Sequence, residues 1–156
     1  MCDAQIGHEK TITGILPTMA GASLIYGAGM LELGVTMSAE ELLIDHDIIS
    51  MIMNITRGIP VNEETLAVDV AAEIGAGGSF IGHESTLAHF NQQSDPVLFD
   101  RRMIGDWAKD GSKNIVDVAH EAAMKIKKEH KPVPLNRDIL RDVKAVVKES
   151  DRNYKG

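Results

Sequence analysis

One short stretch, Ala22-Ser23-Leu24-Ile25-Tyr26-Gly27, decides the predicted fold. It is too short for a helix and too apolar for a strand with one face in water. A continuous apolar run bounded by glycine is typical of a parallel strand that is buried on both faces. One parallel strand needs neighbouring strands to satisfy its backbone hydrogen bonds. We therefore expect a strand at about residues 22–27 whose partner strands lie outside this chain, unless this stretch is a buried connector in an all-helical domain.

Periodic apolar positions predict that most of the remaining chain is helical. Ser38 and Glu41 form a capping box at the start of the clearest helix, and Gly58-Ile59-Pro60 ends it. The same criteria predict the other helices at residues 5–19, 63–74, 83–91 and 114–130, and from Asn136 onward. Between them, residues 95–110 are expected to form a loop anchored by Trp107.

Two expectations concern which side chains face water. His46 stands between Asp45 and Asp47, and three polar groups in a row are expected to be solvated. The last helix is amphipathic, and its apolar side chains are expected to point inward: Ile139, Leu140, Val143, Val146 and Val147.

The composition predicts a folded chain in a reducing compartment. The 156 residues are 44% apolar and carry a formal charge of −7. Cys2 is the single cysteine, which excludes an internal disulfide and favours the cytoplasm. An uncharged stretch at residues 14–30 contains Pro17 and several glycines, so we interpret it as a buried strand with its flanks rather than a membrane span.

Charge is divided unevenly along the chain. Residues 1–124 hold 6 Lys/Arg and 18 Asp/Glu, a net charge of −12, whereas residues 125–156 hold 10 and 5, a net charge of +5. The basic segment predicts a solvated helical tail, with docking on an acidic partner surface as the alternative. Because the tail mixes both signs and the body is acidic, the pattern argues against a nucleic-acid partner.

Two familiar motifs are incomplete in this sequence. Gly27-Ala28-Gly29-Met30-Leu31-Glu32 follows the predicted strand as a dinucleotide-binding loop would, but Glu32 replaces the third glycine and would repel phosphate. At the end of a barrel strand, Glu32 would instead face the mouth of the barrel, or be an exposed loop acid. The six histidines lack the spacing of a zinc site, so we predict no metal site.

Three segments resemble the trimethylamine methyltransferase family. They are Asp3-Ala4-Gln5 with Gly7 and Glu9-Lys10, residues 20–32, and Arg57-Gly58-Ile59 with Asn62, Glu64-Thr65 and Ala67. Residues 78–90 are a weaker fourth match. The resemblance implies α/β architecture, with this chain as the C-terminal part of a (β/α)8 TIM barrel. Residues 1–110 would supply helix seven, strand eight and the following helices, and residues 111–156 would form a helical extension.

The resemblance also implies an activity. Such enzymes transfer a methyl group from trimethylamine or a related methylated amine to the Co(I) corrinoid of a separate protein. Acidic and aromatic side chains at the barrel mouth would hold the cationic amine, and the candidates here are Asp3, Gln5, Tyr26 and Glu32. The cobalt-ligand motif Asp-x-His-x-x-Gly is missing from the sequence, so the cobalamin would be bound by the partner corrinoid protein and not directly by this chain.

The resemblance further implies that the trimethylamine-specific members contain pyrrolysine. Here that catalytic residue would lie upstream of Met1, and no catalytic residue is assigned within the chain. The isolated chain is accordingly expected to be inactive, and the full-length enzyme to be a homo-oligomer. Two alternatives remain: part of a glycine-betaine-type methyltransferase, or a non-catalytic helical module that docks the corrinoid protein.

Overall fold

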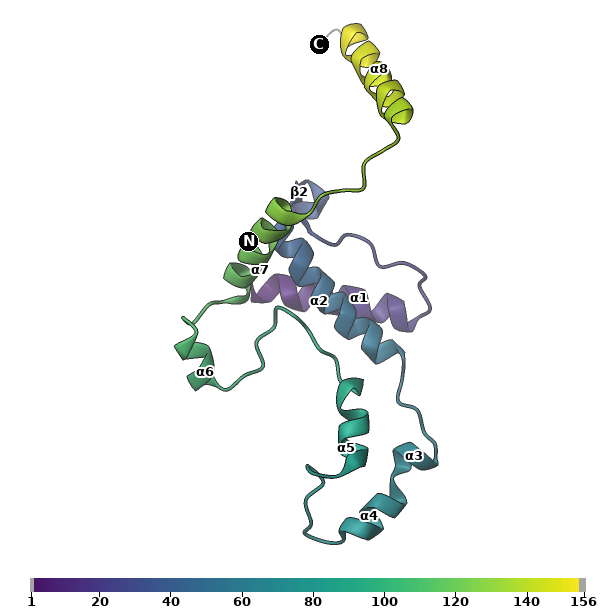
Figure 1. Ribbon diagram of the computed structural model, residues 1–156, viewed down its shortest axis with the longest axis vertical. Helices are drawn as coiled ribbons and strands as arrows, with labels where there is room; N and C mark the ends of the chain where they lie inside the picture. Colours follow the sequence, from purple (N-terminus) through teal and green to yellow (C-terminus); the bar gives the residue numbers. More distant parts are fainter. Residues whose placement is uncertain (1, 155–156) are drawn as a thin grey trace. The chain divides into compact units, whose positions relative to one another are not determined.

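The computed structural model describes residues 2–154, and these are mostly helical (Figure 1). The contacts divide the chain into two units, residues 1–125 and residues 126–156, which are described separately. The first unit contains α1 (Ala4–Met19), β1 (Met30–Leu31), η1 (Glu32–Gly34), β2 (Thr36–Met37), α2 (Ala39–Thr56), α3 (Glu63–Leu66), α4 (Val68–Ile74), α5 (Glu84–His89), η2 (Phe90–Gln92), α6 (Ile104–Lys109) and most of α7 (Ile115–Glu129). The second contains the end of α7 and α8 (Arg137–Asn153).

Side-chain caps explain where the two main helices begin. The Asp3 carboxylate accepts the backbone N–H of Ile6 at the start of α1, and the Ser38 hydroxyl accepts that of Glu41 at the start of α2. The predicted capping box is therefore half confirmed. In a full capping box the Glu41 side chain would also accept the backbone N–H of Ser38. Here that N–H donates instead to the carbonyl of Gly29 at 2.9 Å.

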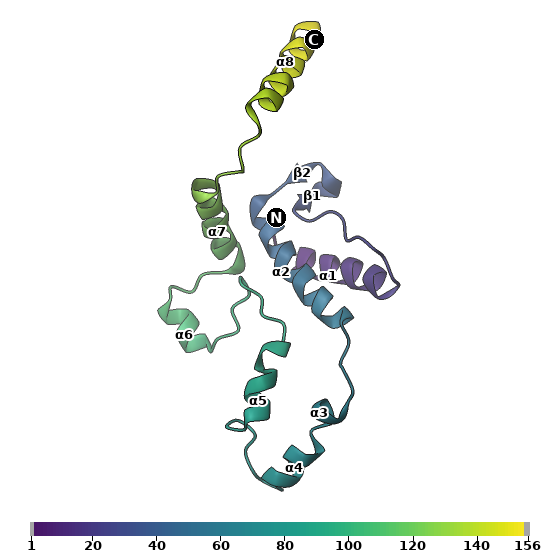
Figure 2. The same ribbon diagram turned by 45° about the vertical axis from the view of Figure 1, so that its right-hand side comes forward.

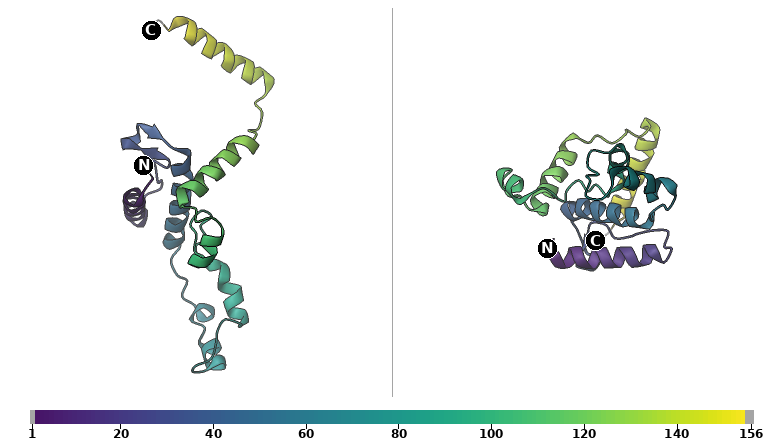
Figure 3. Two further views of the ribbon diagram at one scale, coloured as in Figure 1. Left: turned by 90° about the vertical axis from the view of Figure 1, so that its left-hand side faces the viewer. Right: turned by 90° about the horizontal axis from the view of Figure 1, so that it is seen from below.

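α1 and α2 lie side by side and run in the same direction (Figures 2 and 3). Their contacts advance together along both helices. Lys10 meets Glu41 and Asp45, and four residues later Gly14 faces Ile52, where an added Cβ would lie 2.8 Å from Ile52 Cδ1. The connecting segment must therefore return from the end of α1 to the start of α2, as Figure 1 shows.

The core of this unit is small and centred on α2. Its buried apolar residues are Ile44, Ile48, Ile52, Leu98 and Ala119. Many large apolar side chains remain exposed, including Leu24 at 76% and Tyr26 at 81%. Surfaces of this kind are usually covered by other protein. Among the helices described, none is long and apolar enough to span a membrane.

The core packing leads to a first prediction. We expect Ile52→Val to lower the free energy of unfolding by about 1 kcal/mol, because one buried methylene is lost and leaves a void. Ile52 is 2% exposed, whereas Ile55 on the same helix is 55% exposed. Ile55→Val is the matched control and should change stability by less than about 0.5 kcal/mol. Urea unfolding followed by circular dichroism measures both; equal costs would contradict the described core.

The strand predicted at residues 22–27 is absent from the described structure. Residues 24–27 have no regular secondary structure, and the two strands present form a short antiparallel pair, with Met30 opposite Met37 and Leu31 opposite Thr36. The physical reason is that a parallel strand exists only when a neighbour completes its hydrogen bonds. The chain by itself provides no such neighbour among its described residues.

Other helix predictions were partly wrong. The helix expected at residues 63–74 is interrupted at Ala67, whose φ of 50° is left-handed. The segment expected at residues 83–91 becomes α5 followed by η2. A helix that was not predicted, α6, forms within the expected loop at residues 95–110. The expected anchor is present there, since the Trp107 indole N–H donates to the Lys113 carbonyl at 2.7 Å.

α8 forms where the sequence predicted a helix, and the Asn136 side chain caps it by accepting the N–H of Asp138 at 2.9 Å. The prediction that its apolar side chains point inward was wrong for the described chain. All five are exposed, from 39% for Leu140 to 68% for Val146. Amphipathic spacing indicates which face of a helix is apolar, but it does not provide the surface that buries that face.

Candidate functional site

Three acidic side chains are buried on α2. Glu41 is 0% exposed, Asp45 2% and Asp47 3%. The expectation that Asp45 and Asp47 are solvated is therefore wrong, although His46 between them is exposed. Their burial matters because a buried carboxylate must find an opposite charge, a hydrogen-bond donor or a proton.

Lys10 on α1 provides the opposite charge for two of the three acids. Its ammonium forms an ion pair with Asp45 Oδ2 and lies 3.5 Å from Glu41 Oε1. It also lies 3.5 Å from the carbonyl oxygen of Gly27, to which it donates. Among residues 2–154, three buried carboxylate oxygens have no hydrogen-bond partner: both oxygens of Glu41, and Oδ1 of Asp45. One cation thus faces two buried carboxyl groups, and Asp45 has the closer contact.

Lys10, Glu41 and Asp45 form a buried cluster, and the loop at residues 27–32 is attached to it. The backbone N–H of Gly29 donates to Asp45 Oδ2 at 2.7 Å. Gly29 has a φ of 78°, and a Cβ added there would lie 2.9 Å from Leu42 Cβ. Only glycine therefore allows the loop backbone to approach α2 this closely. A cavity of about 140 Å3 lies beneath the loop, and its lining includes Tyr26, Lys10 and Asp45.

The four substrate-binding residues predicted from the sequence lie on two separate segments. Asp3 caps α1, and the Gln5 amide donates to Glu9 Oε1 at 2.9 Å in the first turns of that helix. Tyr26 is exposed in the loop, and Glu32 accepts the Thr36 hydroxyl at 2.8 Å. Among the described residues, no hydrogen bond joins any two of these four side chains. Lys10 and Asp45 tether the loop at residues 27–32, which follows Tyr26 and ends with Glu32.

Cys2 lies next to Glu41, one of the three buried acids. It lines a cavity of about 320 Å3 together with Asp3, Glu41 and Phe99. Partial burial raises the pKa of the Cys2 thiol from 9.0 to about 11, and its closeness to the Glu41 carboxylate acts in the same direction. Since the thiolate is the reactive form, this environment suppresses nucleophilic chemistry at Cys2.

The raised pKa of Cys2 predicts slow alkylation. At pH 7.5 the folded chain should react with iodoacetamide about 100-fold more slowly than the chain unfolded in urea, because two pKa units reduce the thiolate fraction about 100-fold. The rate in the folded chain should still be rising with pH near 10, where the rate for the unfolded chain has levelled off. A rate equal to that of the unfolded chain at pH 7.5 would show that the thiol is not in this environment.

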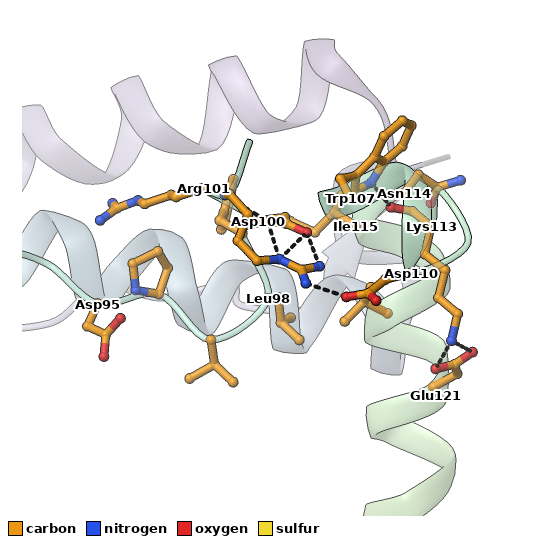
Figure 4. A pocket seen from close by; sticks show the side chains of 15 residues that line it. Asp95, Leu98, Asp100, Arg101, Trp107, Asp110, Lys113, Asn114, Ile115 and Glu121 are labelled. Atoms are coloured by element: carbon orange, nitrogen blue, oxygen red, sulfur yellow. Dashed lines mark hydrogen bonds and ion pairs between the residues drawn. The ribbon is translucent and has the colours of Figure 1, made fainter. Parts of the chain in front are cut away.

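A second loop is attached to Asp47, the third buried acid of α2. Asp47 Oδ2 accepts the backbone N–H of Leu98 at 2.6 Å. The residues after Leu98 line a hollow of about 780 Å3, shown in Figure 4. In its wall the Arg102 guanidinium binds Asp100 at 2.7 Å and also Asp110, and it lowers the pKa of Asp100 to about 2.

Two of the three cations around this hollow are paired with carboxylates. Besides the Arg102 pairs, the Lys113 ammonium lies 2.7 Å from Glu121, and Figure 4 marks both sets of contacts with dashed lines. Phe99, Ile115 and Val118 provide apolar wall. The Arg102 and Lys113 pairs fix the segments on either side of α6, while Arg101 donates to the carbonyl and hydroxyl of Ser94.

Three of the six histidines lie next to carboxylates. His120 Nδ1 lies 2.8 Å from Glu40, His89 Nε2 3.5 Å from Glu64, and His83 Nε2 3.8 Å from Glu73. The His120 contact lowers the pKa of Glu40 to about 2. Within the part of the chain that the structure describes, no three metal-binding side chains come together.

Sequence reasoning missed the cluster of Lys10, Glu41 and Asp45, and also the burial of Asp47. A signal was present: Glu41 and Asp45 fall on the same helical face as Ile48 and Ile52, at spacings of three and four residues. Acidic residues on the apolar face of an amphipathic helix indicate burial and therefore a required partner. The partner, Lys10, is 35 residues away from Asp45 in sequence, so only the packing of α1 on α2 identifies it.

Comparisons with known proteins place the chain in a family. The family model described as "Trimethylamine methyltransferase (MTTB)" matches residues 1–154. A trimethylamine methyltransferase of Methanosarcina mazei is 51% identical over 154 residues, which are 99% of this chain and 31% of the relative. One from Methanosarcina thermophila is 52% identical over 143 residues, 92% of this chain and 30% of the relative. A glycine betaine methyltransferase of Desulfitobacterium hafniense is 31% identical over 110 residues, 69% of this chain and 23% of the relative.

The chain thus spans about a third of the length of the relatives that it matches. The matched region nevertheless covers almost all of this chain, residues 1–154 for the family model. A match of this extent and identity shows common descent, and the protein belongs to the trimethylamine methyltransferase family.

Proposed function

We propose that the chain forms the C-terminal part of a (β/α)8 barrel. The supporting observation is the parallel packing of α1 and α2, joined by a segment that returns between them. Consecutive helices of a (β/α)8 barrel have this relation, with one strand in the return segment. Residues 22–27 would become strand eight once neighbouring strands are present. Residues 1–110 would then belong to the barrel and residues 111–156 to a helical extension.

The activity we infer is methyl transfer from trimethylamine to the Co(I) corrinoid of a separate corrinoid protein. The supporting observation is that about half of the residues, over nearly the whole chain, are identical to those of trimethylamine methyltransferases. The 31% identity to the glycine betaine enzyme makes that quaternary amine the second candidate. The chain would act in the cytoplasm as part of a larger homo-oligomeric enzyme, and the corrinoid would remain on its partner.

Asp3, Gln5, Tyr26 and Glu32 are the proposed amine-binding residues in this chain. A methylated ammonium is bound by negative charge and by the face of an aromatic ring. Tyr26 leaves its ring exposed at 81%, and Glu32 follows it on the loop tethered to Asp45. A neutral tertiary amine transfers a methyl group poorly because the rest of the molecule would have to leave as an amide anion, so the catalytic activation would come from the pyrrolysine expected upstream of Met1.

The test has a genetic and a biochemical part. DNA upstream of Met1 should encode the remaining strands, joined to this frame by an in-frame amber codon. The chain assembled with that upstream part should methylate a cognate corrinoid protein from trimethylamine, and the chain alone should not. Transfer from glycine betaine alone would favour the second substrate. Corrinoid-protein binding without transfer from either amine would overturn catalysis in favour of a docking module.

A further inference from the structure

We propose that Lys10 and Asp45 are positioning residues that hold the loop at residues 27–32 and thereby set the places of Tyr26 and Glu32. The inference rests on the proposed function, because it concerns the amine-binding residues assigned there. Neither Lys10 nor Asp45 is among those residues. Their role would be to act through the loop backbone from the two helices behind it.

The loop is held at successive points by α1 and α2. The Lys10 ammonium donates to the Gly27 carbonyl at 3.5 Å, and Asp45 accepts the Gly29 N–H at 2.7 Å. The Gly29 carbonyl in turn accepts the N–H of Ser38, the residue that caps α2, at 2.9 Å. Both peptide groups of Gly29 are thus tied to α2, so the chain leaves the cluster toward Met30 in a fixed direction.

Burial makes this tether stiff. Asp45 is 2% exposed, and its Oδ2 receives both the Lys10 ammonium and the Gly29 N–H. Hydrogen bonds to a buried ionised carboxylate are stronger than those between neutral groups. The side chains that would touch the amine have weaker ties of their own: Tyr26, directly before the loop, is 81% exposed, and the Glu32 side chain bonds only to the Thr36 hydroxyl in the described contacts. The cluster therefore fixes the start of the loop, and the pairing of β1 with β2 continues that order toward Glu32.

The chain contains a matched control for this role. Asp47 lies on the same helix, is 3% exposed, and accepts a backbone N–H from a different loop, that of Leu98, at 2.6 Å. A substitution at Asp47 therefore replaces a carboxylate that is as buried as that of Asp45 and accepts an equally short hydrogen bond. It leaves the loop at residues 27–32 attached.

Hydrogen exchange of the full 156-residue chain tests the proposal directly. Asp45→Asn should raise amide exchange in residues 27–31 by about tenfold while residues 96–100 stay unchanged, because a neutral amide oxygen accepts the Gly29 N–H more weakly than a carboxylate and forms no ion pair with Lys10. Asp47→Asn should give the converse pattern. The proposal is overturned if residues 27–31 do not respond to Asp45→Asn, or if both variants loosen both loops equally, which would indicate general destabilisation.

Kinetics of the assembled enzyme provide the second readout. Asp45→Asn should raise KM for trimethylamine about tenfold and change kcat less, whereas Asp47→Asn should leave KM near the wild-type value. Equal KM values for the two variants would count against the proposal. An assembly that transfers no methyl group even with the wild-type chain would refute the proposed function instead, and the exchange experiment would still decide whether Lys10 and Asp45 hold the loop.

Discussion

Lys10→Met is expected to lower the free energy of unfolding by about 3 kcal/mol, the lower end of the cost of breaking a buried ion pair. The variant keeps the apolar stem but removes the one cation that faces Glu41 and Asp45, which are 0% and 2% exposed. Two buried carboxyl groups would then lie together with no opposite charge. We choose the lower end because the Lys10 side chain is itself 24% exposed.

Urea unfolding of the chain, followed by circular dichroism, measures this effect. Lys109→Met is the control, since that side chain is 78% exposed in its pair with Asp106 and should contribute less than about 0.5 kcal/mol. Adding Glu41→Gln to Lys10→Met should recover part of the loss, because it removes one of the two stranded carboxylates. A Lys10 variant as stable as the Lys109 variant would contradict the described ion pair between Lys10 and the buried acids.

The helices were predictable where local chemistry determines them. Asp3, Ser38 and Asn136 cap their helices through the bonds that such residues are expected to make. Errors arose where a single backbone conformation interrupts a good pattern, as at Ala67 with its φ of 50°. Apolar spacing continues across that position, so periodicity alone joins two helices that the structure separates.

The site was less predictable than the helices because it depends on long-range packing. Asp45 and Asp47 flank His46 in a polar triplet that resembles a solvated turn of helix, yet both acids are buried. Their partners are a lysine on another helix and two loop N–H groups. The strand expected at residues 22–27 is absent for a related reason: among the described residues no neighbouring strand offers it hydrogen bonds.

Gly29→Ala is expected to lower the free energy of unfolding by about 3 kcal/mol, as much as Lys10→Met. Two costs add: an L-residue at a φ of 78° is strained by about 1 kcal/mol, and the new Cβ would lie 2.9 Å from Leu42 Cβ and 3.0 Å from Met37 Sδ. Leu42 Cβ is fixed to the α2 backbone and cannot move aside, so the loop itself must shift. That shift would draw the Gly29 N–H away from Asp45 and weaken the buried cluster as well.

Gly77→Ala separates these two costs. Gly77 has a φ of 79°, almost the same as Gly29, but a Cβ there would have nothing within 4 Å. It should therefore show the backbone strain alone, about 1 kcal/mol, in the same urea titration. The difference of about 2 kcal/mol between the two variants measures how tightly the loop is pressed against α2. Equal costs would mean that the loop is free to leave that surface, and with it the geometry that places Tyr26 and Glu32.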